Sequence, residues 1–249
     1  MEKNAIAIIG GTGLARMAGL EIIRREEIST PWGSPSAPLT WGRVGSRTVV
    51  FLPRHGERHD TPPHRINYRA NIWALKESGV DGIVAVAAVG GITPAMEPAK
   101  ISVPDQIVDY TSGRANTFFE DDLDHVTHID FTNPYSDRLR RMLLEAGKRS
   151  GIQVHDGGTY GCTQGPRLET TAEIKRLERD GCDLVGMTGM PEAALARELG
   201  LDYACCAVVA NWAAGKSAAE ITMEEIEENL RVGMADVAEL LAEFIAGSA

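Results

Sequence analysis

Short, almost entirely apolar segments recur along the chain and alternate with segments in which the apolar residues have helical spacing. The apolar segments cover residues 5–11, 47–53, 82–91, 183–187 and 203–210. Strands have this composition when both faces of their sheet are covered. The segments with helical spacing cover residues 66–79, 134–151, 170–181 and 191–200, and each ends in glycine. The alternation predicts an α/β protein with a mixed central β-sheet flanked by helices.

The last helix is expected to begin at a capping box formed by Thr222 and Glu225. Its apolar stripe comprises Ile226, Leu230, Met234, Val237, Leu241 and Phe244. The acidic run at 118–125 is typical of a solvated loop. Because no linker, repeat or low-complexity segment interrupts the pattern, we expect residues 1–249 to form a single domain.

Charge and cysteine usage narrow the class of protein. The formal net charge is −10, which argues against a nucleic-acid or anionic-membrane partner. The four cysteines have no C-x-x-C spacing, and three lie in or beside apolar segments, as expected for reduced, buried thiols in a cytoplasmic enzyme. Gly10 and Gly11 end the first apolar segment too early for a signal peptide, and no apolar stretch reaches membrane-spanning length.

Two loops that follow predicted strands carry candidate phosphate ligands. A glycine-rich turn offers backbone N–H groups and the Thr12 hydroxyl. A dinucleotide-binding G-x-G-x-x-G motif is a poorer interpretation, because Arg16 replaces the third glycine, while a plain tight turn remains open. After the second strand, Arg54 presents a planar fork of donors and His55 can add another donor. A solvated Arg–His pair is the alternative.

Four polar residues at later junctions have simple local interpretations. Glu169 and Glu192 suit the first turn of a helix, where acidic residues are favoured. Thr188 suits a helix cap, and Asn211 suits a turn after a strand. The residue types alone leave these interpretations and functional roles open.

Considered together, these segments resemble one known family. The motifs GGTGL, RHG, NYRANIWALK, QGPRLET and MTGMPEA occur in order from Gly10 to the strand that ends near Asn211. They resemble the trimeric purine nucleoside phosphorylase and 5′-methylthioadenosine phosphorylase family. The resemblance implies a single-domain nucleoside phosphorylase fold, a homotrimer with shared active sites, inorganic phosphate as co-substrate, and no metal or organic cofactor. It also implies that phosphate attacks the anomeric carbon while the glycosidic bond breaks through an oxocarbenium-like state.

The resemblance assigns roles residue by residue. The implied phosphate site comprises Thr12, Arg54, His55, Thr188 and the backbone near Ala88. Ala87 stands where the family often has a hydroxyl residue, so one phosphate hydrogen bond is expected to be missing. The implied nucleoside contacts are Met187, Asn211, Trp212 and Ala213, and the implied catalytic residues are Arg54, His55 and Asn211.

Two positions indicate the purine. The adenine-handling branch has aspartate in place of Asn211 and again in place of Ala213. A carboxamide can donate to a 6-oxo group, whereas a carboxylate cannot. Glu169 matches a glutamate that accepts the N1–H of a 6-oxopurine, so we expect hypoxanthine or guanine rather than adenine. Leu168 replaces a common aromatic residue, which reduces contact with the edge of the base.

The 5′ end of the sugar is predicted from two further residues. Met223 aligns with a histidine that bonds a 5′-hydroxyl in the 6-oxopurine branch, and a thioether suits a methylthio group instead. Met223 as an ordinary helix-start core residue is the alternative. His128 matches a residue that reaches the 5′ end from the neighbouring subunit. The combination predicts S-methyl-5′-thioinosine as substrate.

Four other activities remain open. A 5′-methylthioadenosine phosphorylase of relaxed specificity and an inosine/guanosine phosphorylase belong to the same class. An NAD-dependent oxidoreductase and a non-catalytic purine-binding module belong to other classes. The incomplete glycine motif argues against the oxidoreductase, and phosphate-dependent product formation would exclude the binding module.

Overall fold

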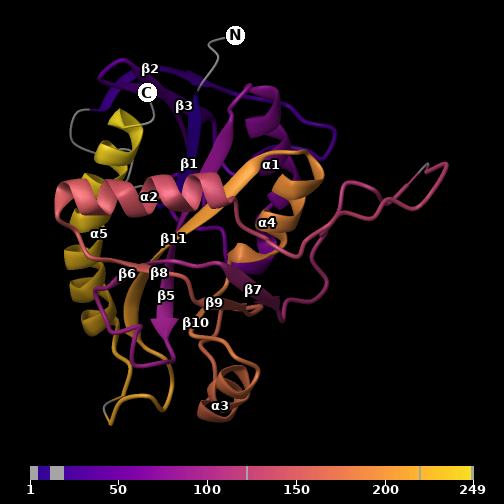
Figure 1. Ribbon diagram of the computed structural model, residues 1–249. Coiled ribbons are helices and arrows are strands. Elements are labelled where there is room, and N and C mark those ends of the chain that lie inside the picture. The colour runs from indigo at the N-terminus through magenta and orange to yellow at the C-terminus, as the bar shows by residue number, and fades with distance from the viewer. Residues whose placement is uncertain (1–4, 12–19, 122, 219, 248–249) are drawn as a thin grey trace.

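A mixed β-sheet forms the centre of the protein (Figure 1). The computed structural model describes residues 5–11, 20–121, 123–218 and 220–247. Within them, the main path of the sheet runs β2 (Leu20–Glu26), β3 (Leu39–Val44), β4 (Arg47–Pro53), β1 (Ile6–Gly10), β5 (Gly82–Gly91), β10 (Leu184–Gly186), β9 (Thr159–Cys162) and β7 (Gln106–Asp109). β11 (Asp202–Trp212) pairs with β5 and β6 (Ile101–Val103), and β6 pairs with β8 (Val154–Asp156).

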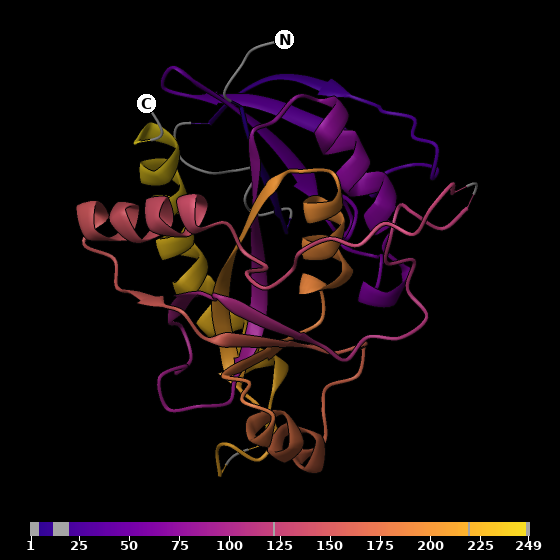
Figure 2. The same ribbon diagram turned by 45° about the vertical axis from the view of Figure 1, so that its right-hand side comes forward.

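Helices cover both faces of this sheet (Figure 2). Their bounds are η2 Pro63–Arg65, α1 Tyr68–Glu77, α2 Asp137–Ser150, α3 Thr171–Arg179, α4 Gly189–Glu198 and α5 Met223–Ala246. One apolar core lies between the sheet and the pair α1 and α4, and a second lies between the sheet and the pair α2 and α5. The expected mixed sheet flanked by helices is therefore confirmed.

All five predicted strands and all five predicted helices are present. β4 and β5 have the predicted bounds, because β5 is apolar from end to end and β4 is apolar from Val49 onward. β11 continues through Asn211 to Trp212 after a register shift, so Asn211 lies within a strand and does not form a turn. Six strands were not predicted: β2, β3, β6, β7, β8 and β9. They are short or, like the solvent-exposed β2, lack a continuous apolar pattern.

The predicted cap and stripe of α5 agree with the structure in part. The Thr222 hydroxyl accepts a hydrogen bond from the N–H of Glu225 at 3.2 Å. Val237, Leu241 and Phe244 are buried, but the earlier members of the stripe are only partly covered. All four cysteines are buried and free, as expected. Among the described residues, no helix has the length and apolar composition needed to cross a membrane.

Candidate active site

The candidate site lies where parallel strands β1, β4 and β5 end. Gly10 is in register with Pro53, and the N–H of Arg54 donates to the Gly10 carbonyl at 3.1 Å, so the ends of β1 and β4 lie side by side. Ala88 is the exposed member of the otherwise buried β5, all of which is described. An exposed residue near the carboxyl end of a parallel strand is a suitable position for a ligand contact. Thr12 lies outside the described residues, so its phosphate contact stays a prediction.

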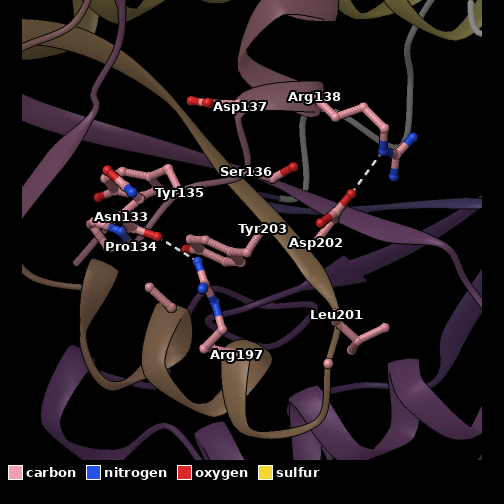
Figure 3. Close-up of a pocket in the computed structure, with 12 residues that line it drawn as sticks. Asn133, Pro134, Tyr135, Ser136, Asp137, Arg138, Arg197, Leu201, Asp202 and Tyr203 are labelled. Carbon is pink, nitrogen blue, oxygen red and sulfur yellow. Dashed lines mark hydrogen bonds and ion pairs between the residues drawn. The ribbon is translucent and has the colours of Figure 1, made fainter. Parts of the chain in front are cut away.

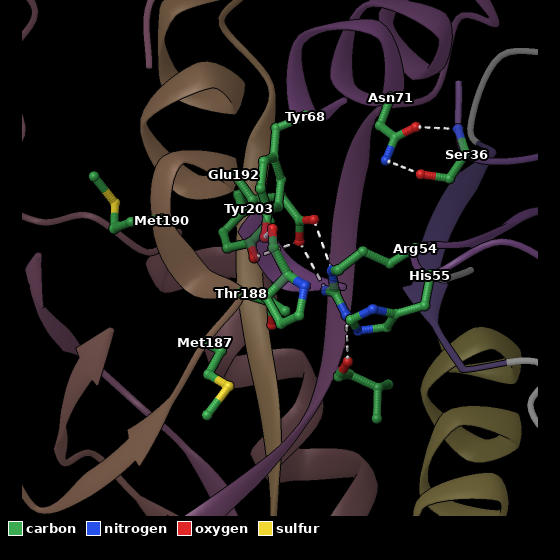
Figure 4. Close-up of polar contacts among 12 residues, drawn as sticks. Ser36, Arg54, His55, Tyr68, Asn71, Met187, Thr188, Met190, Glu192 and Tyr203 are labelled. Atoms are coloured by element: carbon green, nitrogen blue, oxygen red, sulfur yellow. Dashed lines mark hydrogen bonds and ion pairs between the residues drawn. The ribbon is translucent and has the colours of Figure 1, made fainter. Parts of the chain in front are cut away.

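Arg54 is buried and forms an ion pair with the carboxylate of Glu192 (Figure 4). Its Nε and Nη2 atoms each donate to an oxygen of Glu192 at 2.8 Å, and Nη1 donates to the Val86 carbonyl at 3.0 Å. Tyr203 Oη donates to the same carboxylate at 2.9 Å. A guanidinium has five N–H groups, so two remain without a partner among the described residues and can reach an anion.

Burial and the ion pair with Glu192 shift the pKa of Arg54 in opposite directions. Burial alone lowers the pKa of the guanidinium, but the charge and hydrogen bonds of Glu192 outweigh it and raise the pKa above its usual value. Arg54 is therefore charged at any physiological pH. Glu192 compensates that charge, which makes a buried cation tolerable.

Glu192 is the functional-site residue that the sequence interpretation missed. Its predicted position in the first turn of a helix is confirmed, but its exposed fraction is 0%, and its ion pair with Arg54 was not predicted. A signal was available: the residues around it, GMPEAALA, are otherwise uncharged and mostly apolar, and those at 189–193 are all buried. A carboxylate within such a segment requires a cationic partner.

His55 differs from its expected role as a donor. Its Nδ1 lies 2.8 Å from the Thr61 carbonyl, which can only accept, so Nδ1 carries a proton. Burial, together with the nearby charges of Arg54 and His59, lowers the pKa of His55 to about 4 despite that bond. The ring is therefore neutral near pH 7, and Nε2 is an acceptor. It can accept from a protonated phosphate oxygen but cannot donate to one.

Met187 and Thr188 follow β10 on the side of the sheet where Arg54 lies (Figure 4). Thr188 is buried, and its side chain makes no helix-capping bond, so the simple cap interpretation fails. Gly165 adopts a φ of +59°, and a Cβ atom there would overlap the Met187 side chain. A glycine at 165 therefore lets the loop after β9 pack directly on Met187.

Glu169 is held in the loop before α3. Thr163 Oγ1 donates to Glu169 Oε1 at 2.5 Å. The first-turn interpretation of Glu169 is wrong, because Thr170 caps α3 and Glu173 completes the capping box. Glu169 therefore takes no part in capping α3. Leu168, beside it, is 48% exposed and leaves this side of the site open.

Asn211 is buried near the end of β11, immediately after its bulge. Its Nδ2 donates to the Trp212 carbonyl at 2.7 Å, which fixes the orientation of the amide. One N–H and the Oδ1 acceptor remain for a ligand. Ala213 is buried against Gly90 of β5, and Trp212 is partly exposed.

Two of the predicted specificity residues lie on the surface of the isolated chain. Met223 begins α5 and is 62% exposed. His128 is exposed on the segment between β7 and α2, here called the arm (described residues 111–121 and 123–134). Its outer part extends away from the body, while Phe118 and Phe131 pack against the core (Figure 1). The structure therefore gathers Arg54, His55, Met187 and Thr188 but leaves Met223 and His128 uncovered.

A separate cavity of about 450 Å³ lies between the start of α2 and the end of α4 (Figure 3). The predicted site residues do not line it. Its charged groups already have partners: Arg138 pairs with Asp202 at 2.7 Å, and Arg197 donates to the Asn133 carbonyl. Among the described residues, no cluster of His, Cys, Asp and Glu could hold a metal ion.

Comparison with known proteins places this geometry in a family. A sequence model described as "Phosphorylase superfamily" matches residues 5–246. The chain is 60% identical over 97% of its length to a probable S-methyl-5′-thioinosine phosphorylase of Pseudomonas syringae pv. tomato, 98% of which is covered. It is 45% identical over 95% of its length to a 6-oxopurine nucleoside phosphorylase of Pyrococcus furiosus, 90% of which is covered.

The fold comparison agrees. The structure of methylthioadenosine phosphorylase from Schistosoma mansoni in complex with adenine matches 98% of this chain and 91% of its own, with a TM-score of 0.92 and 34% identity. On this agreement of sequence and fold, the chain belongs to the phosphorylase superfamily.

Proposed function

We propose that this enzyme cleaves S-methyl-5′-thioinosine with inorganic phosphate, giving hypoxanthine and 5-methylthio-α-D-ribose 1-phosphate. Two observations carry the proposal: the carboxamide of Asn211 is oriented by the Trp212 carbonyl, and the carboxylate of Glu169 is held by Thr163. The name of the Pseudomonas relative supports it.

Base recognition follows from the donors and acceptors of these two side chains. Asn211 Oδ1 accepts from a protonated N7, and its remaining N–H donates to O6. Glu169 accepts the N1–H of the 6-oxopurine. Adenine has an unprotonated N1 and a 6-amino donor, so it would leave the carboxylate and the amide N–H without partners. Each unmatched buried group costs about 1–3 kcal/mol.

Phosphate binding uses the remaining donors of Arg54 and the acceptor of His55. HPO₄²⁻ has one hydroxyl, which donates to Nε2 of His55, and its unprotonated oxygens accept from Arg54, Thr188 and the predicted Thr12 loop. One of these oxygens forms the bond to C1′ while the bond from C1′ to N9 breaks. The electron pair of that bond leaves with the purine, which gains one proton. The sugar phosphate gives up the proton that HPO₄²⁻ carried, so that atoms and charge balance overall. Electrostatic support for such a separation of charge is typically worth about 10²–10³ in rate per group.

The 5′-methylthio group is assigned to an apolar pocket that includes Met223. Exposure of this residue in the isolated chain fits a pocket that is completed by another subunit. We therefore propose a homotrimer in which His128 from the projecting arm approaches the neighbouring site. Light scattering should give three times the chain mass of 26.9 kDa. A monomeric mass at working concentration would contradict the shared site.

We also place the enzyme in the cytoplasm, on the strength of its four buried, free thiols. Its acidic net charge of −10 fits small-molecule substrates and disfavours nucleic acid and anionic membranes as partners.

Side-by-side turnover is the direct test of the substrate. With phosphate present, kcat/KM for methylthioinosine should exceed that for methylthioadenosine and for inosine by at least about tenfold, the equivalent of one lost buried hydrogen bond. Omission of phosphate should abolish product formation. Faster cleavage of methylthioadenosine would favour the relaxed methylthioadenosine phosphorylase, and faster cleavage of inosine would favour the general 6-oxopurine enzyme.

A further inference from the structure

The base side and the ribose side of the proposed site lie on two separate loops. Glu169 and Thr163 follow β9, and Met187 and Thr188 follow β10. β9 and β10 are parallel neighbours, with Cys162 in register with Gly186. Both loops therefore leave the same edge of the sheet, where the ladder of backbone hydrogen bonds ends. Carbonyl groups just beyond that edge need other donors if they are buried.

Arg114 supplies those donors. Its Nη2 donates to the Gln164 carbonyl at 2.9 Å and to the Thr163 carbonyl at 3.3 Å. Its Nη1 donates to the carbonyls of Met187 at 2.9 Å and Met190 at 2.6 Å. The guanidinium thus bridges the backbone of both loops.

The remaining contacts hold Arg114 itself in place. Its Nε donates to Gln164 Oε1 at 3.1 Å, and Nη1 lies 3.2 Å from the hydroxyl of Tyr68. Gln164 Oε1 also accepts the N–H of Ser112 at 3.1 Å. All three guanidinium nitrogens are used, and each acceptor is a neutral group. This differs from Arg54, whose charge is matched by Glu192.

We infer that Arg114 is a positioning residue that sets the base-binding loop at 163–169 against the ribose-binding segment at 187–190. The inference deepens the proposed function and depends on it for the roles of Glu169 and Met187. Only an arginine fork can reach four carbonyl groups on two loops at once, because a lysine ammonium is a compact donor. Displacement of either loop by about 1 Å would separate the base contact from the reacting carbon and cost about 10²-fold in rate.

A merely structural role is the competing explanation, since Arg114 also lies at the root of the arm at 111–134. The chain offers a matched control in Arg197, which donates to the Asp130 and Asn133 carbonyls near the other end of that arm. Arg197 fastens the same segment but contacts neither loop of the proposed site. Loss of arm attachment alone would therefore affect both arginine variants alike.

The test compares Arg114→Met, Arg114→Lys and Arg197→Met in the full-length protein, with methylthioinosine and phosphate as substrates. Arg114→Met should lower kcat/KM for the nucleoside about tenfold to a hundredfold. KM for phosphate should rise less than KM for the nucleoside, because Arg54 is oriented separately by Glu192 and only Thr188 of the phosphate site lies on a segment that Arg114 holds. Arg114→Lys should be impaired as strongly as Arg114→Met, whereas Arg197→Met, which loosens only the part of the arm that carries His128, should lose clearly less activity than either.

Several results would overturn the inference: unchanged nucleoside kinetics in Arg114→Met, equal losses in Arg197→Met, rescue by lysine, or a parallel rise in both KM values. Light scattering and thermal unfolding show whether each variant keeps its assembly and fold. If Arg114→Met does not fold, Gln164→Met removes the side-chain acceptor shared by Arg114 Nε and the Ser112 N–H, and it should give a smaller loss specific to the nucleoside. No loss there would count against the inference. A wild-type enzyme that cleaves no nucleoside would contradict the proposed function itself.

Discussion

Asn211→Asp is expected to shift the enzyme from a 6-oxopurine toward a 6-aminopurine nucleoside. The carboxylate cannot donate to O6 of hypoxanthine but can accept from the 6-amino group of adenine. One lost and one gained buried hydrogen bond, each worth about 1–3 kcal/mol, should change the ratio of kcat/KM values for methylthioadenosine and methylthioinosine by about a hundredfold or more. Steady-state turnover of both substrates measures the ratio.

The same change also removes the bond from Nδ2 to the Trp212 carbonyl, so the new carboxylate must rotate away from that oxygen. Asn229→Asp is the matched control, because Asn229 donates to the carbonyl of Ala210 at the same bulge and the variant adds the same charge. Its substrate ratio should stay at the wild-type value. If Asn211→Asp gained no activity on methylthioadenosine, the proposed role of the carboxamide would be wrong.

Glu192→Gln is expected to cause the largest loss of stability. The variant leaves the guanidinium of Arg54 buried without its compensating charge, and breaking a buried pair in this way typically costs about 3–5 kcal/mol. Turnover should fall with it, because the bidentate contact that orients Arg54 is lost. Urea unfolding and phosphate-dependent turnover measure the two effects.

A double variant separates stability from catalysis. Arg54→Met combined with Glu192→Leu replaces the ion pair by apolar groups, which is often close to neutral for stability. It should recover most of the unfolding free energy while remaining inactive. Tyr203→Phe removes one donor to the carboxylate and should cost only about 1 kcal/mol. A stable, fully active Glu192→Gln enzyme would contradict the role assigned to the pair.

The main strands and helices could be predicted because their signals are local. β5 is apolar throughout and β4 is apolar from Val49 onward, and the glycines after α1, α2 and α3 mark helix ends. The edge strand β2 has no such signal, since most of its residues face solvent. It is held by pairing with β3, which depends on residues distant in sequence.

The sequence predicted which residues belong to the candidate site better than it predicted the contacts that those residues make. Arg54 and Thr188 were named, and the structure buries both. The expected donor role of His55 depended on a tautomer that only the nearby Thr61 carbonyl decides. Met223 and His128 are exposed in one chain, and their predicted roles require a second subunit.

The sequence by itself determined the apolar strands, the helix boundaries and the order of the motifs, because these are set by residues that are neighbours along the chain. Only the tertiary structure decided which charged groups meet. Glu192 is 138 residues from Arg54, and Arg114 is about half as far from the Met187 carbonyl, 73 residues away. Such pairs form because the strand order brings loop ends to one edge of the sheet, where buried cations and carbonyl groups must satisfy one another.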